Sequence, residues 1–520
     1  MSLAPCGQHE RSSILRQIAE QRTQLMTLKN TAGILQQLLD EVQGQVIRTQ
    51  GGISALENLL PPILNLPYDI TREIFLHCLP PNEGCSKSTQ KAQQLAHVSR
   101  KWRSIAHTIS EFWRTLHVKF DFNEENYDRE GPATARHIST CIHRSKGGPV
   151  ALKLMTGKHL RNFAMKESVT FDHHHPFLVR AVTSVGHRLT SFIYTHFYPP
   201  DLHAIPVGTF GSLETLILHA AVPFRQCINH QIWSEKGPVK AFLDSPSLRR
   251  VGLNTSYYID MVDGRFTNCV PLPWGQLTHF INVDNSIDDS ANNEAFLVME
   301  LPRCKRLQYL ALGLGESQLI NWEALPTTTV TIPNLNSLTL STIGGDEADK
   351  WSELVFRRFV FPSLRALRLD GPCLDVYTNM PGRPSMLSHL LQLDRLSLFC
   401  SLPHQTELLK LCSYTPNVKT LDVHQPISRY PVLWDILSSD VLPLLTTLVV
   451  EAGAAEISRG TIDYVQCRTL DCPPDIAQLA KLVVYAEVAE KFETPGFLKL
   501  AILWETFRWK NTRVIPRVTR

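Results

Sequence analysis

Motifs that mark common enzyme classes are missing from this sequence. It has no glycine-rich phosphate loop, no GxSxG nucleophile elbow and no HExxH zinc motif, and GGDEADK from Gly344 lacks the spacing of a P-loop. Three adjacent histidines begin at His173, but such side chains point in different directions in an extended segment, and no second cluster has ligand spacing. Cys467 and Cys472 are equally weak metal ligands. We therefore expect no enzyme activity, no catalytic residue, no metal site and no cofactor.

Charge of one sign and long apolar runs are also scarce. The formal net charge is only +3 and the basic residues are scattered, whereas binding to nucleic acid needs a concentrated basic surface. No apolar run approaches the roughly 20 residues that span a bilayer, and the first residues, MSLAPCGQHERSS, lack the apolar core of a secretory signal. The twelve cysteines are too far apart for a small disulfide scaffold. We expect an intracellular protein of the cytoplasm and/or nucleus that binds neither nucleic acid nor membrane.

At 520 residues the chain is too long for one compact core, because single domains stop growing at roughly 250 to 300 residues. It is 43% hydrophobic and 19% charged, which is an ordinary globular composition. Several units, or one elongated array of repeats, are therefore expected.

Apolar residues recur every seven positions near the beginning of the chain. One series is Ile18, Leu25, Ala32, Leu39, Val46, Ile53 and Leu60, and the other, interrupted by Gln21 and Thr49, is Ile14, Leu28, Leu35, Val42 and Leu56. This spacing predicts a coiled-coil helix. Each glycine in it costs up to about 1 kcal/mol relative to alanine, so we expect the helix to end or bend before Gly51. Two interpretations stay open: the helix folds back on its own chain, or it forms a homodimer with a second copy.

Two short helical segments follow a boundary at Pro61 and Pro62, since proline cannot continue a helix interior. The stretch NLPYDITREIFLHCLPP predicts one helix with a stripe of apolar side chains. After the polar loop NEGCSKST, from Asn82 to Thr89, the stretch QKAQQLAHVSRKWRSIAHTI predicts a second helix. Its apolar residues recur at spacings of three and four: Leu95, Val98, Trp102, Ile105 and Ile109.

Beyond Arg114 one seven-residue sequence motif, called a string below, recurs along the chain. It has the form polar, Leu, two variable residues, Leu, one variable residue, Leu, and successive starts lie 24 to 35 residues apart, a period of about 28. The strings are RLTSFIY from Arg188, SLETLIL from Ser212, SLRRVGL from Ser247, QLTHFIN from Gln276, RLQYLAL from Arg306, NLNSLTL from Asn334, SLRALRL from Ser363, QLDRLSL from Gln392, NVKTLDV from Asn417 and LLTTLVV from Leu444. This is the strand step of a leucine-rich repeat.

Stacked repeats of this kind share one apolar core and expose a concave parallel sheet that can grip another macromolecule. Side chains alternate between the two faces of a strand, so the leucines enter the core and the residues between them face outward. Unrelated strands in an ordinary α/β domain would give irregular spacings. We predict that a target protein is read by these outward residues: Thr339, Ser341, Arg368, Asp370, Ser397, Asp422 and His424.

The segment from Leu66 to Trp113 resembles an F-box, most closely the form common in mushroom-forming (basidiomycete) fungi. The resemblance rests on a Leu-Pro start, an Ile-Phe pair on the first helix, a Val-x-Arg-x-Trp-Arg step and a closing Trp: Leu66, Pro67, Ile70, Ile74, Phe75, Leu79, Val98, Ser99, Arg100, Trp102, Arg103, Ile105, Ala106 and Trp113. Asp69 stands where Glu is usual, Ser99 stands where Cys is usual, and the loop between the helices is longer than usual. CIHRSKGGPVALKL, from Cys141, is similar to the element that follows the F-box in those proteins.

The resemblance implies a partner, a Skp-type adaptor and through it a cullin. The family's contacts with that adaptor match Leu66, Pro67, Ile70, Ile74, Leu79, Val98 and Trp102. Each of these side chains could instead belong to the internal core, and for Trp102 and Phe75 core and interface are equally plausible. The implied function is substrate recognition for a Skp/cullin/F-box E3 ubiquitin ligase. The alternative is a scaffold or receptor without a ubiquitin role that uses the coiled coil and the repeats to bind protein.

The expected fold class is α/β: an N-terminal coiled-coil helix, a small all-α F-box and an irregular α/β leucine-rich repeat solenoid. The expected limits are 1–60 for the coiled coil, 61–118 for the F-box, 119–187 for a connecting segment with the first repeat cap, 188–460 for the solenoid and 461–520 for a C-terminal cap.

Overall fold

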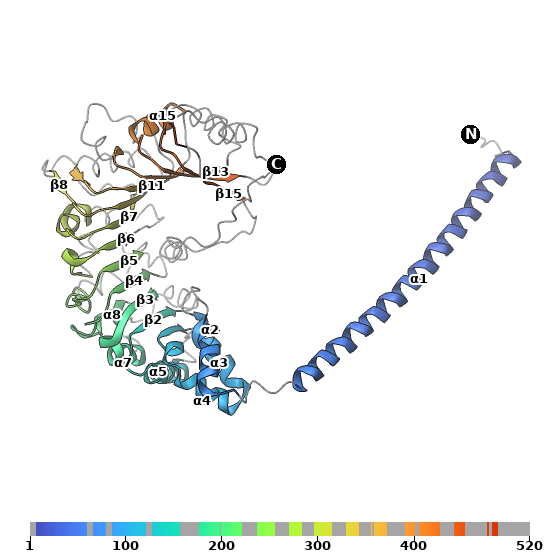
Figure 1. Cartoon of the computed structure of the whole chain (residues 1–520), viewed down its shortest axis with the longest axis horizontal. Helices are drawn as coiled ribbons and strands as arrows, with labels where there is room; N and C mark the ends of the chain where they lie inside the picture. The colour runs from blue at the N-terminus through green and yellow to red at the C-terminus, as the bar shows by residue number, and fades with distance from the viewer. Residues whose placement is uncertain are drawn as a thin grey trace, which may run out of the picture. The chain divides into compact units, whose positions relative to one another are not determined.

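The computed structural model describes residues 7–59, 66–79, 86–120, 127–156, 176–197, 199–220, 237–254, 270–282, 296–314, 329–342, 355, 358–371, 390–400, 405–426, 441–452, 476–477 and 481–486. The chain divides into two compact units. Figure 1 labels their helices and strands. One unit comprises Met1–Cys78 with Leu95–Ala106, and the other comprises Leu79–Gln94 with His107–Arg520. No helix in the described ranges is long and apolar enough to cross a membrane.

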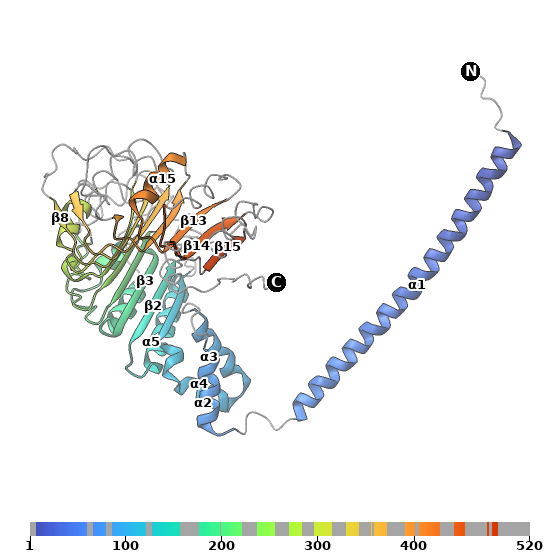
Figure 2. The ribbon, with the colours of Figure 1, turned by 45° about the horizontal axis from the view of Figure 1, so that its top comes forward.

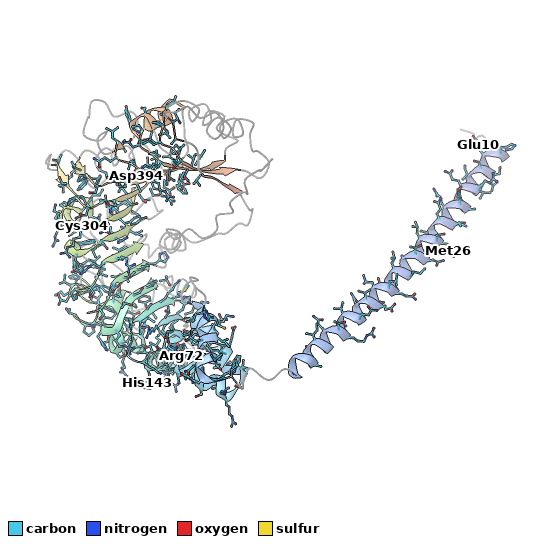
Figure 3. The ribbon with its side chains drawn as sticks, in the orientation of Figure 1. Glu10, Met26, Arg72, His143, Cys304 and Asp394 are labelled. Atoms are coloured by element: carbon cyan, nitrogen blue, oxygen red, sulfur yellow. The ribbon has the colours of Figure 1, made fainter. Side chains whose placement is uncertain are left out.

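The first unit begins with one uninterrupted helix, α1 (Gln8–Leu59, 52 residues). The expectation that it would end or bend before Gly51 is wrong. A Cβ atom added at Gly33, Gly44, Gly51 or Gly52 would meet nothing within 4 Å, so these positions only weaken the helix and do not break it. The described side chains of α1 are exposed almost without exception, as Glu10 and Met26 illustrate in Figure 3. Whether α1 packs on its own chain or on a second copy stays open.

Three short helices and a 3₁₀ turn follow: α2 (Tyr68–His77), α3 (Ser86–Val98), α4 (Arg100–Thr108) and η2 (Ser110–Trp113). The single second helix expected from Gln90 to Ile109 is in fact two. The hydroxyl of Ser99 accepts a hydrogen bond of 3.1 Å from the backbone N–H of Trp102, which is the contact of a helix N-cap and starts α4 afresh. The first of the two, α3, begins at Ser86, inside the stretch expected to be a loop.

In the described residues of the second unit, thirteen strands form one sheet, each parallel to its neighbours and all in chain order. The strands are β1 (Thr115–Phe120), β2 (Val150–Thr156), β3 (Leu189–Phe197), β4 (Thr215–Ala220), β5 (Arg250–Asn254), β6 (His279–Asn282), β7 (Tyr309–Leu314), β9 (Ser337–Thr342), β11 (Ala366–Gly371), β12 (Arg395–Cys400), β13 (Thr420–Pro426), β14 (Thr447–Ala452) and β15 (Lys481–Ala486). A separate parallel pair joins β8 (Val330–Thr331) to β10 (Phe359–Val360). This is the α/β solenoid, similar to leucine-rich repeats, that the strings predict, and the expected fold class is confirmed.

The segments between the strands contain short helices of several types. They are α5 (Tyr127–Arg144), α7 (Pro176–Val185), α8 (Pro199–His203), α15 (Gln405–Tyr414) and the single turns η3 (Gly186–Arg188), η4 (Trp274–Gln276), η6 (Phe296–Glu300) and η7 (Leu301–Arg303). α5 packs against β1 and α7, and Figure 2 shows it beside the first strands of the sheet. In the described parts of these segments the elements differ from repeat to repeat, from the full helix α5 between β1 and β2 to the single turn η4 before β6.

The fifth and seventh residues of the strings lie on one face of the sheet, and in the central strings both are buried leucines. They form continuous files across β9, β11 and β12: Leu338, Leu367 and Leu396 in one, Leu340, Leu369 and Leu398 in the other, each at most 2% exposed. Stacked aromatic rings extend this core in the earlier repeats, with 5.5 Å between the ring centroids of Phe192 and Phe210 and 5.1 Å between those of Phe210 and Phe242. Burying one such side chain contributes about 1.5–3 kcal/mol, so the repeats are held together mainly by this file of apolar contacts.

A ladder of backbone hydrogen bonds fixes the register between repeats. The third residue of each string donates its N–H to the carbonyl oxygen of the third residue of the preceding string, at 2.8 to 3.0 Å. The ladder runs through Thr190, Glu214, Arg249, Thr278, Gln308, Asn336, Arg365, Asp394, Lys419 and Thr446. The ten strings found in the sequence are thus joined one after another by nine such bonds.

Polar side chains at the first position of several strings add a second link between repeats. The Asn334 side chain donates to the carbonyl oxygen of Lys305 at 2.7 Å, Ser363 donates to Pro333 at 2.6 Å, and Asn417 donates to Leu391 at 2.6 Å. Each bond spans one repeat. This explains in physical terms why the string begins with a polar residue.

The sheet extends beyond the expected 188–460 solenoid at both ends, since β1 and β2 precede it and β15 follows it. The string QLAKLVV from Gln478 matches the repeat motif and carries the last of these strands. The expected domain limits themselves stay predictions.

Asn336 offers a direct test of the ladder, because its side chain is exposed and only its backbone is a rung. Asn336→Pro removes the N–H that donates to Gln308 and should lower the free energy of unfolding by about 1–3 kcal/mol. Asn336→Ala keeps the N–H and should stay within about 0.5 kcal/mol of the natural chain. Denaturant unfolding of the full chain measures both. Equal effects of the two substitutions would contradict a backbone ladder at this position.

Candidate functional site

The face of the sheet opposite the leucines is its outward face, and its side chains line up in rows across the strands. The central row is small or apolar from β3 to β7, polar or charged from β9 to β13, and apolar again at β14. In order it reads Ile193, Ile217, Gly252, Ile281, Ala311, Thr339, Arg368, Ser397, Asp422 and Val449. The polar part is four strands wide, which is about 15 Å.

The predicted target-reading residues lie in this polar part. Thr339, Arg368, Ser397 and Asp422 are direct neighbours in the central row, and Ser341 and Asp370 are neighbours in the next row. Their exposure differs, because Thr339, Ser341, Ser397 and Asp422 are buried, whereas Arg368 and Asp370 are half-buried. His424 lies on β13, and its side chain is outside the described residues.

The charged side chains of this surface hold one another in place. The guanidinium of Arg368 lies 3.6 Å from the centroid of the Phe399 ring and pairs with Asp370 at 3.2 Å. On the next strands, Arg395 pairs with Asp422, also at 3.2 Å. Arg368, Asp370 and Arg395 keep 27%, 37% and 31% of their side-chain area exposed, while Asp422 keeps 7%. The face therefore presents two arginines that are pre-oriented by their neighbours and still reachable from solvent.

Sequence reasoning missed Arg395 and Phe399, although both occupy outward positions of the same strand as Ser397. Alternation along the strand could have found them. The contact of Arg368 with Phe399 could not have been found that way, because it depends on the register between β11 and β12, which places Asp370 opposite Phe399.

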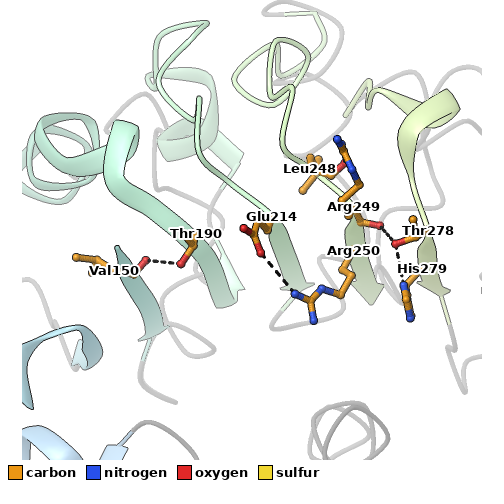
Figure 4. A network of polar contacts seen from close by, with 8 residues as sticks. All are labelled: Val150, Thr190, Glu214, Leu248, Arg249, Arg250, Thr278 and His279. Atoms are coloured by element: carbon orange, nitrogen blue, oxygen red, sulfur yellow. Dashed lines mark hydrogen bonds and ion pairs between the residues drawn. The ribbon is translucent and has the colours of Figure 1, made fainter. Parts of the chain in front are cut away.

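Earlier in the sheet, separate polar contacts join neighbouring repeats near the beginnings of the strands from β2 to β6 (Figure 4). Arg250 pairs with Glu214 at 3.7 Å, and the Thr278 hydroxyl lies 3.1 Å from the Arg249 carbonyl oxygen and 2.9 Å from Nδ1 of His279. The His279 ring stacks on Tyr309, with 5.9 Å between ring centroids. Burial, with a smaller contribution from Arg250, lowers the pKa of His279 to about 4, so this imidazole is neutral at pH 7.

Titratable groups in the described parts of the chain do not form a reactive constellation. Burial raises the pKa of Cys141 to about 11 and that of Cys412 to about 12, so these thiols stay protonated and are poor nucleophiles. No group of His, Cys, Asp and Glu in the described ranges could hold a metal ion. The His173 run and the Cys467–Cys472 pair lie outside those ranges.

In the first unit, α2 and α4 meet through an aromatic pair. The rings of Phe75 and Trp102 lie 4.9 Å apart in an edge-to-face arrangement, and their exposed fractions are 0% and 9%. Trp102 therefore lies in the core, which sequence reasoning could not decide. The Lys101 ammonium donates to the Leu66 carbonyl oxygen at 3.0 Å, and the Arg103 guanidinium donates to Ala96, also at 3.0 Å. These two bonds tie the start of α2 and the end of α3 to α4.

Other predicted docking side chains remain on the surface. Ile70 is 50% exposed and Val98 is 56% exposed, and Pro67 is also exposed. Leu66 and Ile74 are half-buried. Leu79 is half-buried as well, and it belongs to the second compact unit. A small unit that buries Phe75 and Trp102 while it exposes two β-branched residues has apolar surface left for a partner.

These helices coincide with a known family. Residues 63–119 match the family model described as F-box-like. This part of the chain is an F-box-like domain. No curated protein matches the chain. The F-box-like domain thus contains α2, α3, α4 and η2 and ends at the first strand of the sheet.

The end of the F-box-like domain is anchored to the solenoid within the second unit. Trp113 is 1% exposed and the guanidinium of Arg144, at the end of α5, lies 4.6 Å from its ring centroid. Arg144 begins the RSKGGP segment, whose Lys146 and Gly147 adopt positive φ angles of 50° and 77°. The side chain of Arg188 then donates to the Gly148 carbonyl oxygen at 2.8 Å. The element noted after the F-box in the sequence is therefore a turn that joins Trp113 to the first repeats.

Trp102 of the F-box-like domain permits a paired test of its core role. Trp102→Ala should lower the free energy of unfolding by about 3–5 kcal/mol, because a buried aromatic side chain is lost. Nε1 of Trp102 is buried and has no hydrogen-bond partner in the part of the chain that the structure describes. Trp102→Phe therefore loses volume but no hydrogen bond, and it should cost only about 1–2 kcal/mol. The midpoint of chemical denaturation measures both, and an Ala variant as stable as the natural chain would contradict the core assignment.

Proposed function

We propose that this chain is the substrate-recognition adaptor of a Skp/cullin/F-box ubiquitin ligase. Its F-box-like domain would dock to a Skp-type adaptor, and the outward face of its solenoid would bind the target protein. The observation that carries the proposal is the F-box-like match at residues 63–119 directly followed by a long parallel sheet. Proteins of the F-box type are typically not catalytic themselves, so ubiquitin transfer would be the task of other subunits, and the chain would act inside the cell.

The docking surface would consist of the exposed apolar residues of the F-box-like domain. Pro67, Ile70 and Val98 support this because they are exposed, and burying them against a partner would remove apolar area from water. Leu66, Ile74 and Leu79, which are half-buried, would add to it. Trp102 would contribute by packing against Phe75, which positions α2 and α4, and not by direct contact.

Substitution of the exposed pair separates docking from folding. Ile70→Asp with Val98→Asp should weaken binding to a purified Skp-type adaptor by at least about 30-fold, because a carboxylate cannot be buried in an apolar interface without a partner. Stability should hardly change, since both side chains are already exposed. Isothermal titration calorimetry with the full chain gives the affinity.

The matched control places the same change on the solenoid. Val207 is 50% exposed and Met299 is 51% exposed, so Val207→Asp with Met299→Asp alters equally exposed apolar side chains outside the F-box-like domain. This variant should bind the adaptor like the natural chain. Undiminished binding by the Ile70 and Val98 variant, or an equal loss in the control, would refute the proposed docking surface.

The target would be read by the polar part of the outward face. Arginine is enriched at the residues that dominate protein interfaces, and Arg368 and Arg395 are held in one orientation before any target arrives. A width of about 15 Å across four strands suits a short protein segment better than a folded domain. Because the surface carries both charge signs, such a segment would itself contain acidic and basic side chains.

Arg368 has a matched control on its own strand segment. Arg368→Ala removes an outward side chain from the centre of the polar surface, whereas Arg365→Ala removes an exposed arginine at the ladder position three residues earlier. Proximity labelling of cells under proteasome inhibition should lose its target proteins with Arg368→Ala and keep them with Arg365→Ala. Identical sets of labelled proteins for the natural chain and Arg368→Ala would show that the target binds elsewhere.

A scaffold or receptor without a ubiquitin role is the second candidate, and α1 favours it, since a helix of 52 residues with exposed apolar side chains is suited to assembly. Removal of residues 1–60 distinguishes the two candidates. If the chain is a scaffold, this deletion should abolish its function, and the Ile70 and Val98 substitutions should leave that function intact. If the chain is a ligase adaptor, the Ile70 and Val98 substitutions should abolish its function.

A further inference from the structure

Helix α1 carries an apolar seam along one side, and its large side chains are exposed. In the heptad notation, the a positions are Ile18, Leu25, Ala32, Leu39, Val46 and Ile53, and the d positions are Ile14, Gln21, Leu28, Leu35, Val42 and Thr49. The large apolar members are between 40% (Ile18) and 67% (Leu28) exposed. From Ile14 to Ile53 the seam is about 60 Å long at 1.5 Å per residue. We propose that α1 pairs with α1 of a second copy of this chain as a parallel, in-register, two-stranded coiled coil.

The glycines of α1 support a partner along the a and d seam. Gly33 is at a b position, Gly44 and Gly51 are at f positions, and Gly52 is at a g position, so no glycine interrupts the seam. A Cβ at any of them would meet nothing within 4 Å. The residues that weaken the helix are thus kept away from the seam, while an unbroken row of side chains is available to enter the holes of a partner helix.

The flanks of the seam favour a copy of the same chain over an unrelated helix. In a parallel pair, a g residue faces the e residue of the next heptad on the other helix. Gln17 would face Arg22, Gln24 would face Lys29, and Gln45 would face Gln50. No pair of like charges arises when the helix meets itself. Equally, the flanks lack the complementary charges that usually select a different partner.

The two polar d residues decide the orientation. In a parallel pair in register, Gln21 faces Gln21 of the other copy and Thr49 faces Thr49, so each amide or hydroxyl meets a group with which it can form a hydrogen bond. In an antiparallel pair, a residues face d residues. With Leu39 opposite Leu28, Gln21 would face Val46 and Thr49 would face Ile18, and both polar groups would be buried without partners.

The branching of the seam residues is mixed. β-branched residues at a with leucine at d favour dimers, and Ile18, Val46 and Ile53 at a with Leu28 and Leu35 at d follow this pattern. Leu25 and Leu39 at a, with Ile14 and Val42 at d, depart from it, so the number of strands is decided by the measurement below. The small layer of Ala32 lets the two backbones approach closely near the middle of the seam.

The oligomeric state of the full chain tests the pairing. Light scattering coupled to size-exclusion chromatography should give twice the 58.8 kDa of one chain. Leu28→Asp with Leu35→Asp should raise the dissociation constant by more than about a hundredfold, since four carboxylates would meet in the seam. A control, Ile34→Asp with Ile47→Asp, changes side chains that are 59% and 70% exposed but lie at c and b positions, outside the seam. This control should remain dimeric.

The orientation is tested by mixing two charge variants of the full chain with different tags. If Gln21 faces Gln21, a Gln21→Glu chain and a Gln21→Lys chain should form mixed dimers well beyond the one in two expected by chance, because the mixed pair joins opposite charges. In an antiparallel pair both variants would face Val46, and mixing would be random. Native mass spectrometry measures the proportions of the Gln21→Glu homodimer, the Gln21→Lys homodimer and the mixed dimer.

Several results would overturn the proposal: a monomeric natural chain at micromolar concentration, a trimer, dissociation of the Ile34 and Ile47 control, or random mixing of the Gln21 variants. Docking to a Skp-type adaptor does not enter the argument. Calorimetry with the Leu28 and Leu35 variant separates the two proposals, since this variant should be monomeric and still bind the adaptor.

Discussion

The backbone ladder between the third residues of successive strings is the constraint on which the solenoid depends. Each rung, 2.8 to 3.0 Å long, sets one string in register with the next, and the register shifts between β3 and β4 and between β13 and β14 come only after the paired core residues, so the apolar residues of the strings arrive on the same face. A slip of one residue in a strand would exchange its two faces and expose its leucines to water. The ladder and the leucine files therefore enforce each other, and neither depends on the length of the segment that connects two strands.

Since the ladder and the buried apolar residues determine the fold, the residues of the outward face are free to vary. Because the backbone and the buried leucines specify the register, the outward residues need not stabilise the fold, and the central row can change from Ile281 and Ala311 to Arg368 and Asp422 without any change in architecture. The same constraint brings residues of different repeats together. Asp422 meets Arg395 although 27 residues separate them, and the register alone accounts for it.

The periodic parts of the structure could be predicted from the sequence because the rules that govern them are local or strictly repeated. All ten strings are strands, and the heptads are a helix. The break between α3 and α4 at Ser99 was missed because it depends on a single hydroxyl, which caps α4. The apolar residues from Leu95 to Ile109 keep helical spacing across this break and give no sign of it. The continuation of α1 past Gly51 was missed because the cost of glycine is small against a helix of this length. The burial of Trp102 needed the position of Phe75, which lies in another helix.

The three surfaces that the described residues leave open differ in chemistry, and the difference bears on how long each contact should last. The seam of α1 is apolar and complementary to itself, which is the character of permanent interfaces. The F-box-like domain exposes a few apolar side chains around a small core, and a core of this size gains stability from a constant partner. The outward face between β9 and β13 carries charges that are already paired within the chain. A target bound there, as proposed, would have to compete with Asp370 for Arg368 and with Asp422 for Arg395, so each new contact would replace an existing one and the net gain would be small. Such a surface would discriminate between targets and release them, whereas the two apolar surfaces would form lasting contacts. The proposed adaptor, which would keep its assembly and exchange its substrates, would need this distribution of apolar and charged contacts.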